Sequence, residues 1–405
     1  MQRVVTLCEQ AGIEFKTIPS LQDIGQRAVR LDELKDVDLE DLLGREPVTL
    51  DWDSLHRALV GKRVLITGGG GSIGAELCRL MARLNPSGLT VIDNCEFNLY
   101  RIDHELRRDY PDLALDTILG DICDPATVEW TLERSRPEVI FHAAAFKHLP
   151  MLQGQVREAF RNNVMGTRLV AEAAARQGVK TFVFISTDKA VNPANVMGAT
   201  KRVAERYCRA LNEQSATRFM TVRFGNVLNS TGSVVPLFRE QIRNGGPVTV
   251  THPRIRRYFM SASEAGQLIL QAAAIGAGGE IFVLDMGEPV SIRYLAEQLI
   301  RLAGKMPEKD IEIVYTGLRP GEKLFEELFY ANESLRPTSH SKILQAQANQ
   351  VQYDALESEL RQAERAVADY DLERLHRLLI ELVPELRESA TGAEPDRVMP
   401  IERAG

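Results

Sequence analysis

The sequence predicts an α/β protein built on a doubly wound parallel sheet, with a smaller C-terminal lobe. Three observations support this fold class. Short, almost wholly apolar segments alternate with helical segments from residue 61 to residue 225, as in a parallel sheet that helices cover on both faces. A glycine-rich turn, GGGGSIG, separates the first apolar segment from the first helix. The alternation weakens after residue 225, where Gly, Pro and Arg become frequent.

The chain begins with a helical pattern followed by a strand pattern, which together cover residues 2–19. A single helix–strand pair cannot bury its apolar face alone. We therefore interpret residues 1–60 as the remnant of an upstream α/β domain plus an acidic connector with one or two short helices. On this interpretation the natural protein extends further upstream, or this start was chosen for expression.

Residues 61–225 carry the alternating pattern of the main domain. Helical spacing is clear in the segment from 159 to 178, where Phe160, Val164 and Ala171 share one face. Strands are expected at residues 63–67, 89–93, 116–119, 139–143, 181–186 and 219–224.

Beyond the main domain we expect a substrate-binding lobe over residues 226–350. Residues 351–405 are assigned to C-terminal helices and a tail. Two amphipathic helices are expected within 352–388, because apolar residues recur there at helical spacing among many charge pairs. The stretch from Ser389 lacks periodicity and is expected to be disordered.

The composition is that of an ordinary soluble globular protein. Of 405 residues, 44% are hydrophobic and 26% charged, and the net charge of −7 argues against broad nucleic-acid binding. Five cysteines without a CxxC pair support neither a disulfide framework nor a zinc site. No metal is therefore expected, and a reducing cytoplasm fits. No segment approaches the roughly 20 apolar residues of a membrane helix.

The segment RVLITGGGGSIG predicts a dinucleotide site, because its glycines follow an apolar strand and open a helix. Such glycines let the backbone approach a pyrophosphate, whose charge the helix N-terminus favours. Asp93 ends the next strand, and its carboxylate can bind a ribose diol and would repel a 2′-phosphate, which favours NAD over NADP. A plain glycine-rich turn with a helix-capping aspartate is the alternative. Five residues of the turn are expected to contact the cofactor: Gly68, Gly71, Ser72, Ile73 and Gly74.

Two further strand ends support the same cofactor. In LGDICD, Asp121 and Ile122 are placed to flank an adenine. In FHAAAFKH, small side chains allow a close approach of the backbone, although core packing is a serious alternative for any one of them. These small residues are Ala143, Ala144 and Ala145. Residues 61–225 are thus predicted to be an NAD-binding Rossmann domain.

The segment FISTDKAVNPANVMGATK raises a question about acid–base chemistry. Lys201 stands four residues after Met197, where many NAD enzymes place a catalytic tyrosine, and methionine cannot carry a proton. Thr187, Asp188 and Lys189 follow a strand, at the carboxyl edge where ligands bind in such sheets. An adjacent carboxyl and amine can share proton transfers if burial and proximity shift their pKa values. A solvated Asp–Lys pair in a turn is the alternative.

Taken together, TGGGGSIG, GDICD, HAAAFK and the lysine four residues after position 197 resemble the extended short-chain dehydrogenase/reductase superfamily. The segments STDKAVNPANVMGATKR, RFGNVLNSTGSVVPLF and GLRPGEKLFEEL narrow this to a resemblance to the membrane-anchored nucleotide-sugar 4,6-dehydratases of bacterial polysaccharide and glycan biosynthesis. In that family, methionine at the position of Met197 is typical of the long members. The resemblance also implies transmembrane helices and another α/β domain upstream, with anchoring at the cytoplasmic face of the bacterial inner membrane.

The resemblance implies NAD-dependent removal of water from a UDP-N-acetylhexosamine such as UDP-N-acetylglucosamine. C4 is oxidised, water is lost across C5 and C6, and hydride returns to C6, giving a 4-keto-6-deoxy sugar with retention expected at C5. By the same resemblance Lys189 is the C5 base, Asp188 the acid for the C6 hydroxyl, and Thr187 a hydrogen-bond partner near C4. Lys201 would hold the nicotinamide ribose. The group that takes the C4 proton stays open.

Cations are needed for the diphosphate of such a substrate. Arg257 and Arg319 are favoured, because guanidinium groups match phosphate oxygens, whereas Arg256 is given no role. His142 ends a buried strand and is expected to be structural. Six residues are expected to bind the substrate: Lys147, His148, Asn226, Arg257, Arg319 and Glu322.

Two other functions remain open from the sequence. An NAD-dependent 4-epimerase returns its hydride to C4, but such enzymes usually need the tyrosine that Met197 replaces. A non-catalytic NAD-binding scaffold is the other alternative, and the intact Asp188 and Lys189 argue against it. The gluco or galacto identity of the sugar is also open. We expect at least a homodimer, because superfamily members commonly pair through two helices per subunit.

Overall fold

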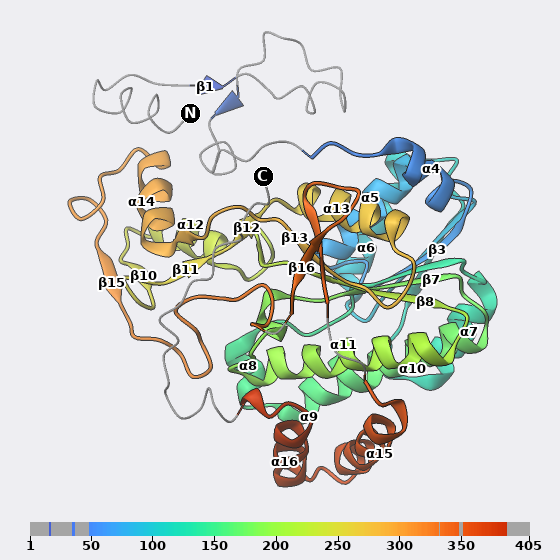
Figure 1. Ribbon diagram of the computed structural model, residues 1–405. Helices are drawn as coiled ribbons and strands as arrows, with labels where there is room; N and C mark the ends of the chain where they lie inside the picture. Colours follow the sequence, from blue (N-terminus) through green and yellow to red (C-terminus); the bar gives the residue numbers. More distant parts are fainter. Residues whose placement is uncertain (1–15, 18–34, 37–47, 332, 348–350, 387–405) are drawn as a thin grey trace.

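The computed structural model describes residues 16–17, 35–36, 48–331, 333–347 and 351–386. Within them a nine-stranded sheet crosses the molecule, with helices above and below it (Figure 1). Seven adjacent strands, from β13 to β5, run parallel, and β17 and β16 extend one edge in antiparallel orientation. The predicted doubly wound α/β fold is confirmed. The strand order is β16 (Leu335–Pro337), β17 (Ile343–Ala346), β13 (Ile281–Leu284), β8 (Arg218–Arg223), β7 (Thr181–Ile185), β6 (Val139–His142), β3 (Arg63–Thr67), β4 (Gly88–Asp93) and β5 (Leu115–Leu119).

All six strands predicted from the sequence are present, and their ends differ from the prediction by at most one residue. The central strands form because their apolar side chains are buried on both faces of the sheet. All five residues of β7, for example, are buried. Such continuous apolar runs are typical of strands in a parallel sheet covered by two helical layers.

Two helical layers cover the sheet, each over its own apolar core. The first layer consists of α4 (Trp52–Leu59), α5 (Ser72–Arg83), α6 (Glu96–Asp109) and α13 (Ala262–Ile275). The second consists of α7 (Pro125–Ser135), α8 (Leu149–Gln153), α9 (Val156–Ala159), α10 (Thr167–Arg176) and α11 (Val196–Gln214). The helix predicted from residue 159 to 178 is α10 preceded by a π-helical stretch, Phe160–Gly166. Its wider turns carry the buried side chains of Asn162 and Asn163.

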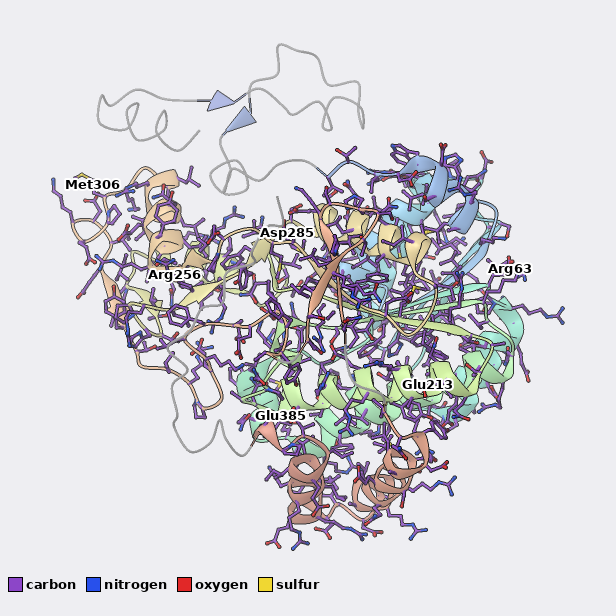
Figure 2. All side chains as sticks on the ribbon, viewed as in Figure 1. Arg63, Glu213, Arg256, Asp285, Met306 and Glu385 are labelled. Atoms are coloured by element: carbon purple, nitrogen blue, oxygen red, sulfur yellow. The ribbon has the colours of Figure 1, made fainter. Side chains whose placement is uncertain are left out.

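A smaller lobe with its own apolar core lies beyond the carboxyl edge of the sheet (Figure 1). Arg63, at the amino end of β3, lies at the opposite side of the molecule from Arg256 and Met306 in the lobe (Figure 2). Its strands form three separate pairs: β10 with β15, β11 with β14, and β9 with β12. The lobe contains β9 (Asn226–Val227), α12 (Val234–Arg243), β10 (Val248–Val250), β11 (Arg256–Arg257), β12 (Phe259–Met260), β14 (Val290–Ser291), α14 (Ile292–Leu302) and β15 (Ile313–Tyr315).

The predicted boundary at residue 225 cuts through the main sheet. Strands β13, β16 and β17 come from the range assigned to the lobe, yet they pair with β8 and with one another in the nine-stranded sheet. The chain therefore enters the lobe after β8, returns as β13, enters the lobe again from β14 to β15, and returns as β16 and β17. The sequence pattern missed these returns because the partners of β13, β8 and β17, are far away in the chain.

The two helices predicted near the C-terminus are present as α15 (Tyr353–Ala368) and α16 (Leu372–Leu382). They form a hairpin beneath the layer that contains α9 to α11 (Figure 1). At the other end of the chain, Lys16–Thr17 pairs with Lys35–Asp36 as two short strands. The rest of the pattern predicted for residues 2–19 lies outside the described residues, as does the tail from Ser389. In the described part, no helix is long and apolar enough to cross a membrane.

Candidate active site

The glycine-rich turn between β3 and α5 is closely packed. Gly68 has a φ of +66°, which favours glycine. A Cβ on Gly68 would come within 2.6 Å of the Ala144 backbone, and one on Gly74 within 2.0 Å of the Gly68 carbonyl oxygen. Only glycine fits at these two positions. The turn can therefore bring main-chain amides to the N-terminus of α5, the arrangement that binds a pyrophosphate.

A cavity of about 200 Å³ opens beside this turn. Seven of the predicted cofactor residues line it: Gly68, Gly71, Asp93, Ile122, Ala143, Ala144 and Ala145. The carboxylate of Asp93 is fixed in the wall, since Oδ2 accepts from the Gly70 N–H at 2.9 Å and Oδ1 from the Cys95 N–H at 2.8 Å. Each oxygen keeps a lone pair for a ribose diol. The cavity therefore fits the adenosine half of a dinucleotide.

Several other predicted cofactor residues stand outside the cavity lining. Ser72 and Ile73 begin α5 behind the turn. Asp121 instead accepts hydrogen bonds from the Cys123 N–H and from Arg161, both at 2.9 Å. Burial acts to raise the pKa of Asp121, but these two donors outweigh it and lower the pKa. Asp121 thus holds the loop after β5 in place.

Seven other lining residues were not predicted from the sequence: Ile92, Asn94, Cys95, Asn98, Gly120, Phe146 and Asn162. They come from four segments far apart in the chain, so no local motif connects them. Asn98 packs against the turn, because a Cβ on Gly70 would come within 2.6 Å of Asn98 Cβ. A polar residue one helical turn after Cys95 is the only local signal that could have pointed to it.

Thr187, Asp188 and Lys189, which follow β7 after Ser186, form a hydrogen-bonded group around a buried carboxylate. Thr187 caps a short 3₁₀ turn, Asp188–Ala190. Asp188 is fully buried, and its Oδ1 accepts from the Thr187 hydroxyl at 2.9 Å and from Lys189 Nζ at 2.8 Å. Lys189 Nζ also donates to Asn226 Oδ1 at 2.8 Å. The turn is thus a buried polar group rather than a solvated pair, with Asn226 from β9 as a fourth member.

The two oxygens of the Asp188 carboxylate differ in their surroundings. Oδ1 has two donors, whereas Oδ2 is buried without a hydrogen-bond partner among the described residues. A Cβ on Gly225, two residues after β8, would come within 3.0 Å of Oδ2, so the glycine avoids crowding this buried oxygen. A buried oxygen without a partner is costly in free energy. This oxygen is therefore the one available to a proton or to a substrate hydroxyl.

Met197 and Lys201 lie one turn apart at the start of α11. Met197 is buried in the apolar core of the second helical layer. Lys201 Nζ donates to the Ile185 carbonyl at 2.6 Å and stands 4.0 Å from the centroid of the Phe184 ring. Burial lowers the pKa of Lys201 to about 8, although Glu205 and Cys208 act in the opposite direction. The structure thus places Lys201 directly behind the end of β7.

Lys147 and His148 follow β6 on the other side of this group. The pKa of Lys147 is lowered by burial and by the charge of Lys189. The pKa of His148 is also lowered, by burial and by Lys147. Asn163 fixes this loop, because its amide nitrogen donates to the Phe146 carbonyl at 3.0 Å and its Oδ1 accepts from the Phe146 N–H at 2.8 Å. Lys147 and Lys189 are therefore brought to one region from two loops.

His142 lies behind this region with no exposed surface. Its ring nitrogens lie 2.8 Å from the Thr67 hydroxyl and 3.0 Å from the Thr167 hydroxyl. Burial, with a smaller effect from Lys201, lowers the pKa of His142 to about 3. A neutral ring fixed between two hydroxyls fits the structural role expected from the sequence.

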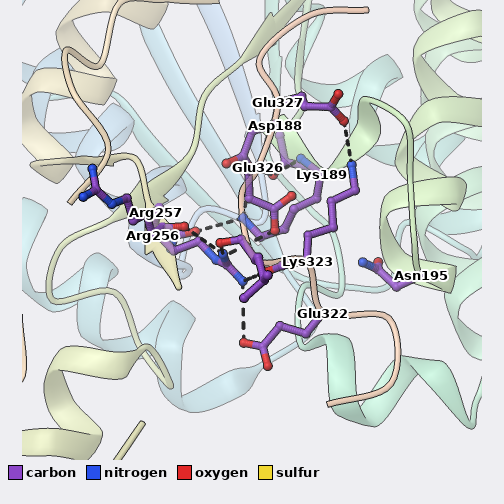
Figure 3. Close-up of polar contacts among 12 residues, drawn as sticks. Asp188, Lys189, Asn195, Arg256, Arg257, Glu322, Lys323, Glu326 and Glu327 are labelled. Carbon is purple, nitrogen blue, oxygen red and sulfur yellow. Dashed lines mark hydrogen bonds and ion pairs between the residues drawn. The ribbon is translucent and has the colours of Figure 1, made fainter. Parts of the chain in front are cut away.

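Arg257, expected to bind a diphosphate, is buried and bound to the protein itself (Figure 3). Its guanidinium donates to the carbonyl oxygens of Arg256, Lys323 and Leu324 at 2.8–3.1 Å. It also lies 3.6 Å from Glu322. Arg257 therefore holds the segment that contains LRPGEK, and few of its donors remain for a ligand. The neighbouring Arg256, to which the sequence assigned no role, is exposed.

The same segment is also bound to the 3₁₀ turn after β7 and to the chain just beyond it. Lys323 Nζ donates to the Val191 carbonyl at 3.1 Å, and the Tyr330 hydroxyl to the Ala190 carbonyl at 3.0 Å. Asn195, the N-cap of α11, donates to the Gly321 carbonyl at 3.0 Å. Glu322 accepts from the Arg319 N–H at 3.2 Å and so shapes the turn that carries the exposed Arg319. Residues 319–330 thus connect the lobe to the end of β7.

A family model described as "Polysaccharide biosynthesis protein" matches residues 64–348. The chain belongs to this family. Within it, the capsular polysaccharide biosynthesis protein CapD of Staphylococcus aureus is 48% identical over 82% of this chain and 56% of its own length. The chain thus spans about half the length of that relative. The sequence-based assignment to the nucleotide-sugar enzymes of the extended short-chain dehydrogenase/reductase superfamily is confirmed.

Other relatives carry the names of two different activities. A UDP-N-acetylglucosamine 4,6-dehydratase (inverting) of Campylobacter jejuni is 31% identical over 68% of this chain and 79% of its own length. A UDP-glucose 4-epimerase of Rickettsia rickettsii is 33% identical over the same two shares. The solved structure of Pen from Bacillus thuringiensis is 36% identical and covers 67% of this chain and 84% of its own, with a TM-score of 0.63. The relatives of this chain thus carry both dehydratase and epimerase names.

Proposed function

We propose that this chain is an NAD-dependent UDP-N-acetylhexosamine 4,6-dehydratase, with UDP-N-acetylglucosamine as the first substrate to test. The observation that carries the proposal is the buried Asp188–Lys189 pair at the end of β7, next to a core methionine in place of a tyrosine. Loss of water across C5 and C6 needs a base and an acid at adjacent carbons. The pair offers both within 2.8 Å of each other. The 4,6-dehydratase among the relatives supports the same reaction.

Each member of the group takes one proposed role. Lys189 is the base at C5, held between Asp188 and Asn226. Asp188 takes the C4 hydroxyl proton at Oδ2 and then gives it to the leaving C6 hydroxyl, because Oδ1 already accepts from Thr187 and Lys189. Thr187 orients the carboxylate and faces the sugar near C4. A bound nicotinamide would accept a hydride from C4 and return it to C6.

NAD is the proposed cofactor because the cavity beside the glycine-rich turn fits its adenosine half. Gly68 and Gly74 leave room for a pyrophosphate, and Asp93 presents two carboxylate oxygens to a ribose. A 2′-phosphate would meet the negative charge of Asp93. Lys201 would hold the nicotinamide ribose from the start of α11. For this it would exchange its bond to the Ile185 carbonyl for one to the ligand.

The proposed diphosphate site differs from the one expected from the sequence. Arg319 keeps its role, but we now propose Arg256 in place of Arg257 as the second cation. Arg256 is exposed, whereas the donors of Arg257 are directed at three carbonyl oxygens. Lys147 and His148 remain the proposed contacts on the opposite side. Arg256→Ala should therefore raise KM with little effect on the melting temperature, and Arg257→Ala should lower the melting temperature.

A 4-epimerase is the second candidate, favoured by the epimerase name among the relatives. That reaction needs one group to remove and return the C4 hydroxyl proton, and Met197 cannot do so. Incubation with UDP-N-acetylglucosamine in deuterated water separates the candidates. The dehydratase gives a C6 methyl group with deuterium at C5, and the epimerase gives UDP-N-acetylgalactosamine without exchange at C5. A non-catalytic scaffold gives neither product, and this outcome or the epimerase product would overturn the proposal.

The roles of the pair are tested by Asp188→Ala and Lys189→Ala. Each variant should lose turnover by at least about 10²-fold, in line with general acid–base catalysis, while it still binds NAD. Lys180→Ala is the matched control, because its ammonium pairs with Glu138 on the surface and is 66% exposed. Near-normal turnover in either pair variant would refute the role assignments.

The setting of the reaction is also a proposal. The name of the CapD relative supports a product used in surface polysaccharide, with protein glycosylation as the other possible use. Attachment of the whole protein to the cytoplasmic face of the inner membrane, through a segment outside this chain, is proposed from the resemblance. A homo-oligomer and retention at C5 are proposed on the same basis. Proton NMR of the product would decide the C5 configuration.

A further inference from the structure

The segment between β9 and α12 crosses from the lobe to the glycine-rich turn. We define residues 228–233, LNSTGS, as the strap. At its tip, the main-chain N–H of Thr231 donates to Ser72 Oγ at 3.2 Å, a contact between residues 159 positions apart. Ser72 is the first residue of α5, where the proposed pyrophosphate site lies. The strap therefore reaches from the lobe to the N-terminus of α5, beside the glycine-rich turn.

The strap also touches the loop after β6. A Cβ on Gly232 would lie 2.4 Å from His148 Cε1, so the strap backbone packs directly on the imidazole ring. His148 is the N-cap of α8 and follows Lys147, one of the proposed substrate contacts. The strap thus spans from the turn after β3 to the loop after β6. These two loops flank the carboxyl edge of the sheet where the dinucleotide is proposed to lie.

The conformation of the strap is specific, but its attachment is weak. Asn229 and Gly232 have φ values of +56° and +69°, so two of its residues adopt the left-handed region. Leu228 anchors its start through a bond from its N–H to the Met260 carbonyl at 2.9 Å. The exposed tip is held by a single neutral hydrogen bond and by the contact with His148. Such a tip can open at a small free-energy cost.

We propose that the strap closes over the bound dinucleotide and slows its release. This inference rests on the proposed function, because a hydride taken from C4 has to return to C6 of the same substrate. Release of the reduced cofactor between the two transfers would leave a 4-keto sugar nucleotide and free NADH. A closed strap keeps both in the site until the second transfer. The hydrogen bond from the Thr231 N–H to Ser72 Oγ, which we call the latch, holds the strap closed.

Removal of the latch donor tests the inference directly. Thr231→Pro lacks the N–H that donates to Ser72, whereas Thr231→Ala keeps it and serves as the matched control. The rate of NAD release from the purified full chain is measured by rapid dilution into an NAD-capturing enzyme. Thr231→Pro should release NAD about five- to ten-fold faster than Thr231→Ala, the loss expected for one hydrogen bond. Equal rates in folded variants would overturn the inference.

A second variant covers the case in which proline prevents folding. Gly232→Ala combines strain at a positive φ with a clash against His148. Gly178→Ala is its control, because Gly178 has a φ of +70° and no atom within 4 Å of a Cβ. Only Gly232→Ala should speed NAD release, and equal release in both would overturn the inference. NAD release is measured without substrate, so this test does not depend on dehydratase activity. If the latch variants released NAD faster but the wild type showed no dehydratase activity, the proposed function would be refuted and the role of the strap in NAD retention would be supported.

Discussion

Lys201 is an amine in an almost closed apolar setting. It is 5% exposed, and its Nζ contacts the Ile185 carbonyl oxygen and the face of the Phe184 ring. Burial lowers its pKa to about 8 from the usual value of 10.5, and the nearby Glu205 and Cys208 only partly oppose this. A lysine that holds a ribose and adds positive potential has to be protonated. The proposed activity should therefore decline as the pH rises through about 8.

The lowered pKa of Lys201 predicts a pH-dependent stability. Between pH 8 and 10.5 the unfolded chain binds a proton that the folded chain has lost, so the free energy of unfolding rises with pH in this window. Below pH 8 both states carry the proton, and above 10.5 neither does. Relative to Lys201→Met, the wild type should gain up to about 3 kcal/mol across the window. Urea unfolding at several pH values measures the free energy of unfolding of both proteins. If that free energy changed with pH in the same way for both, the prediction would be wrong.

Met197 is 4% exposed and packs in the core of the second helical layer. Met197→Ala should lower the free energy of unfolding by about 2–5 kcal/mol, because it leaves a cavity. The same change should leave most of the turnover intact, because no proton passes through a thioether. Met197→Leu, which conserves volume, should cost less than about 1.5 kcal/mol. If Met197→Leu abolished turnover in a folded protein, the side chain would have a role beyond packing.

Adjacent arginines show where sequence-based reasoning reaches its limit. Strand periodicity places Arg256 and Arg257 on opposite faces of β11. It does not say which face meets the interior, and the structure buries Arg257 against carbonyl oxygens of residues 323 and 324. The Asp188–Lys189 pair was predictable because it directly follows an apolar strand. Asn226 was expected only to bind substrate, and its bond to Lys189 could not be predicted because that bond depends on how β9 folds back.

At the scale of elements, the apolar strands and the glycine-rich turn could be predicted because each is specified by adjacent residues. The cavity wall could not, because Asn98 on α6 and Asn162 in the π-helical stretch meet only after the sheet forms. The return of β13 to the sheet was missed for the same reason. Its partner on one side, β8, is about 60 residues away, and its partner on the other, β17, follows the lobe. Long-range pairing of this kind has no local signal.

A buried ion-pair group joins β8, α11 and the chain before β16. Arg223 is fully buried and donates to Glu205 at 2.8 and 2.9 Å and to Glu333 at 2.8 Å. Glu205 also accepts from the Ser186 hydroxyl at 2.6 Å, just before the Thr187–Lys189 segment. Every charge in this group therefore has a partner, and removal of the arginine would leave two carboxylates buried together.

Arg223→Met should lower the free energy of unfolding by about 3–5 kcal/mol, the usual effect of breaking a buried pair. Arg176→Met is the matched control, because Arg176 pairs with Glu129 on the surface and is 57% exposed. The control should change stability by less than about 1 kcal/mol. Urea unfolding of the two variants gives both values. Similar losses would mean that the buried group contributes no more than a surface pair.

At the scale of the whole molecule, the C-terminal hairpin covers a face that the two-layer fold would otherwise leave open. Leu356, Leu360 and Leu379 of the hairpin belong to the same apolar core as α10 and α11. Arg168 on α10 binds Glu357 at 2.6 Å and Glu364 at 3.3 Å on α15. The hairpin thus covers the outer face of α10 and α11 in the second helical layer. Any oligomer has to use another face or displace the hairpin.

Two adjacent residues of α15 allow this covering role to be tested. Leu360, on the inner face of the hairpin, is fully buried, whereas the side chain of Arg361 is 68% exposed. Leu360→Glu places an unpaired carboxylate in an apolar core, which should lower the melting temperature and detach the hairpin. The uncovered face of α10 and α11 should then bind a hydrophobic dye and raise the mass found by light scattering. Arg361→Glu adds the same group on the outer face and should change neither property. If Leu360→Glu had the melting temperature of Arg361→Glu and the wild-type mass, the hairpin would not contribute to the stability of the core.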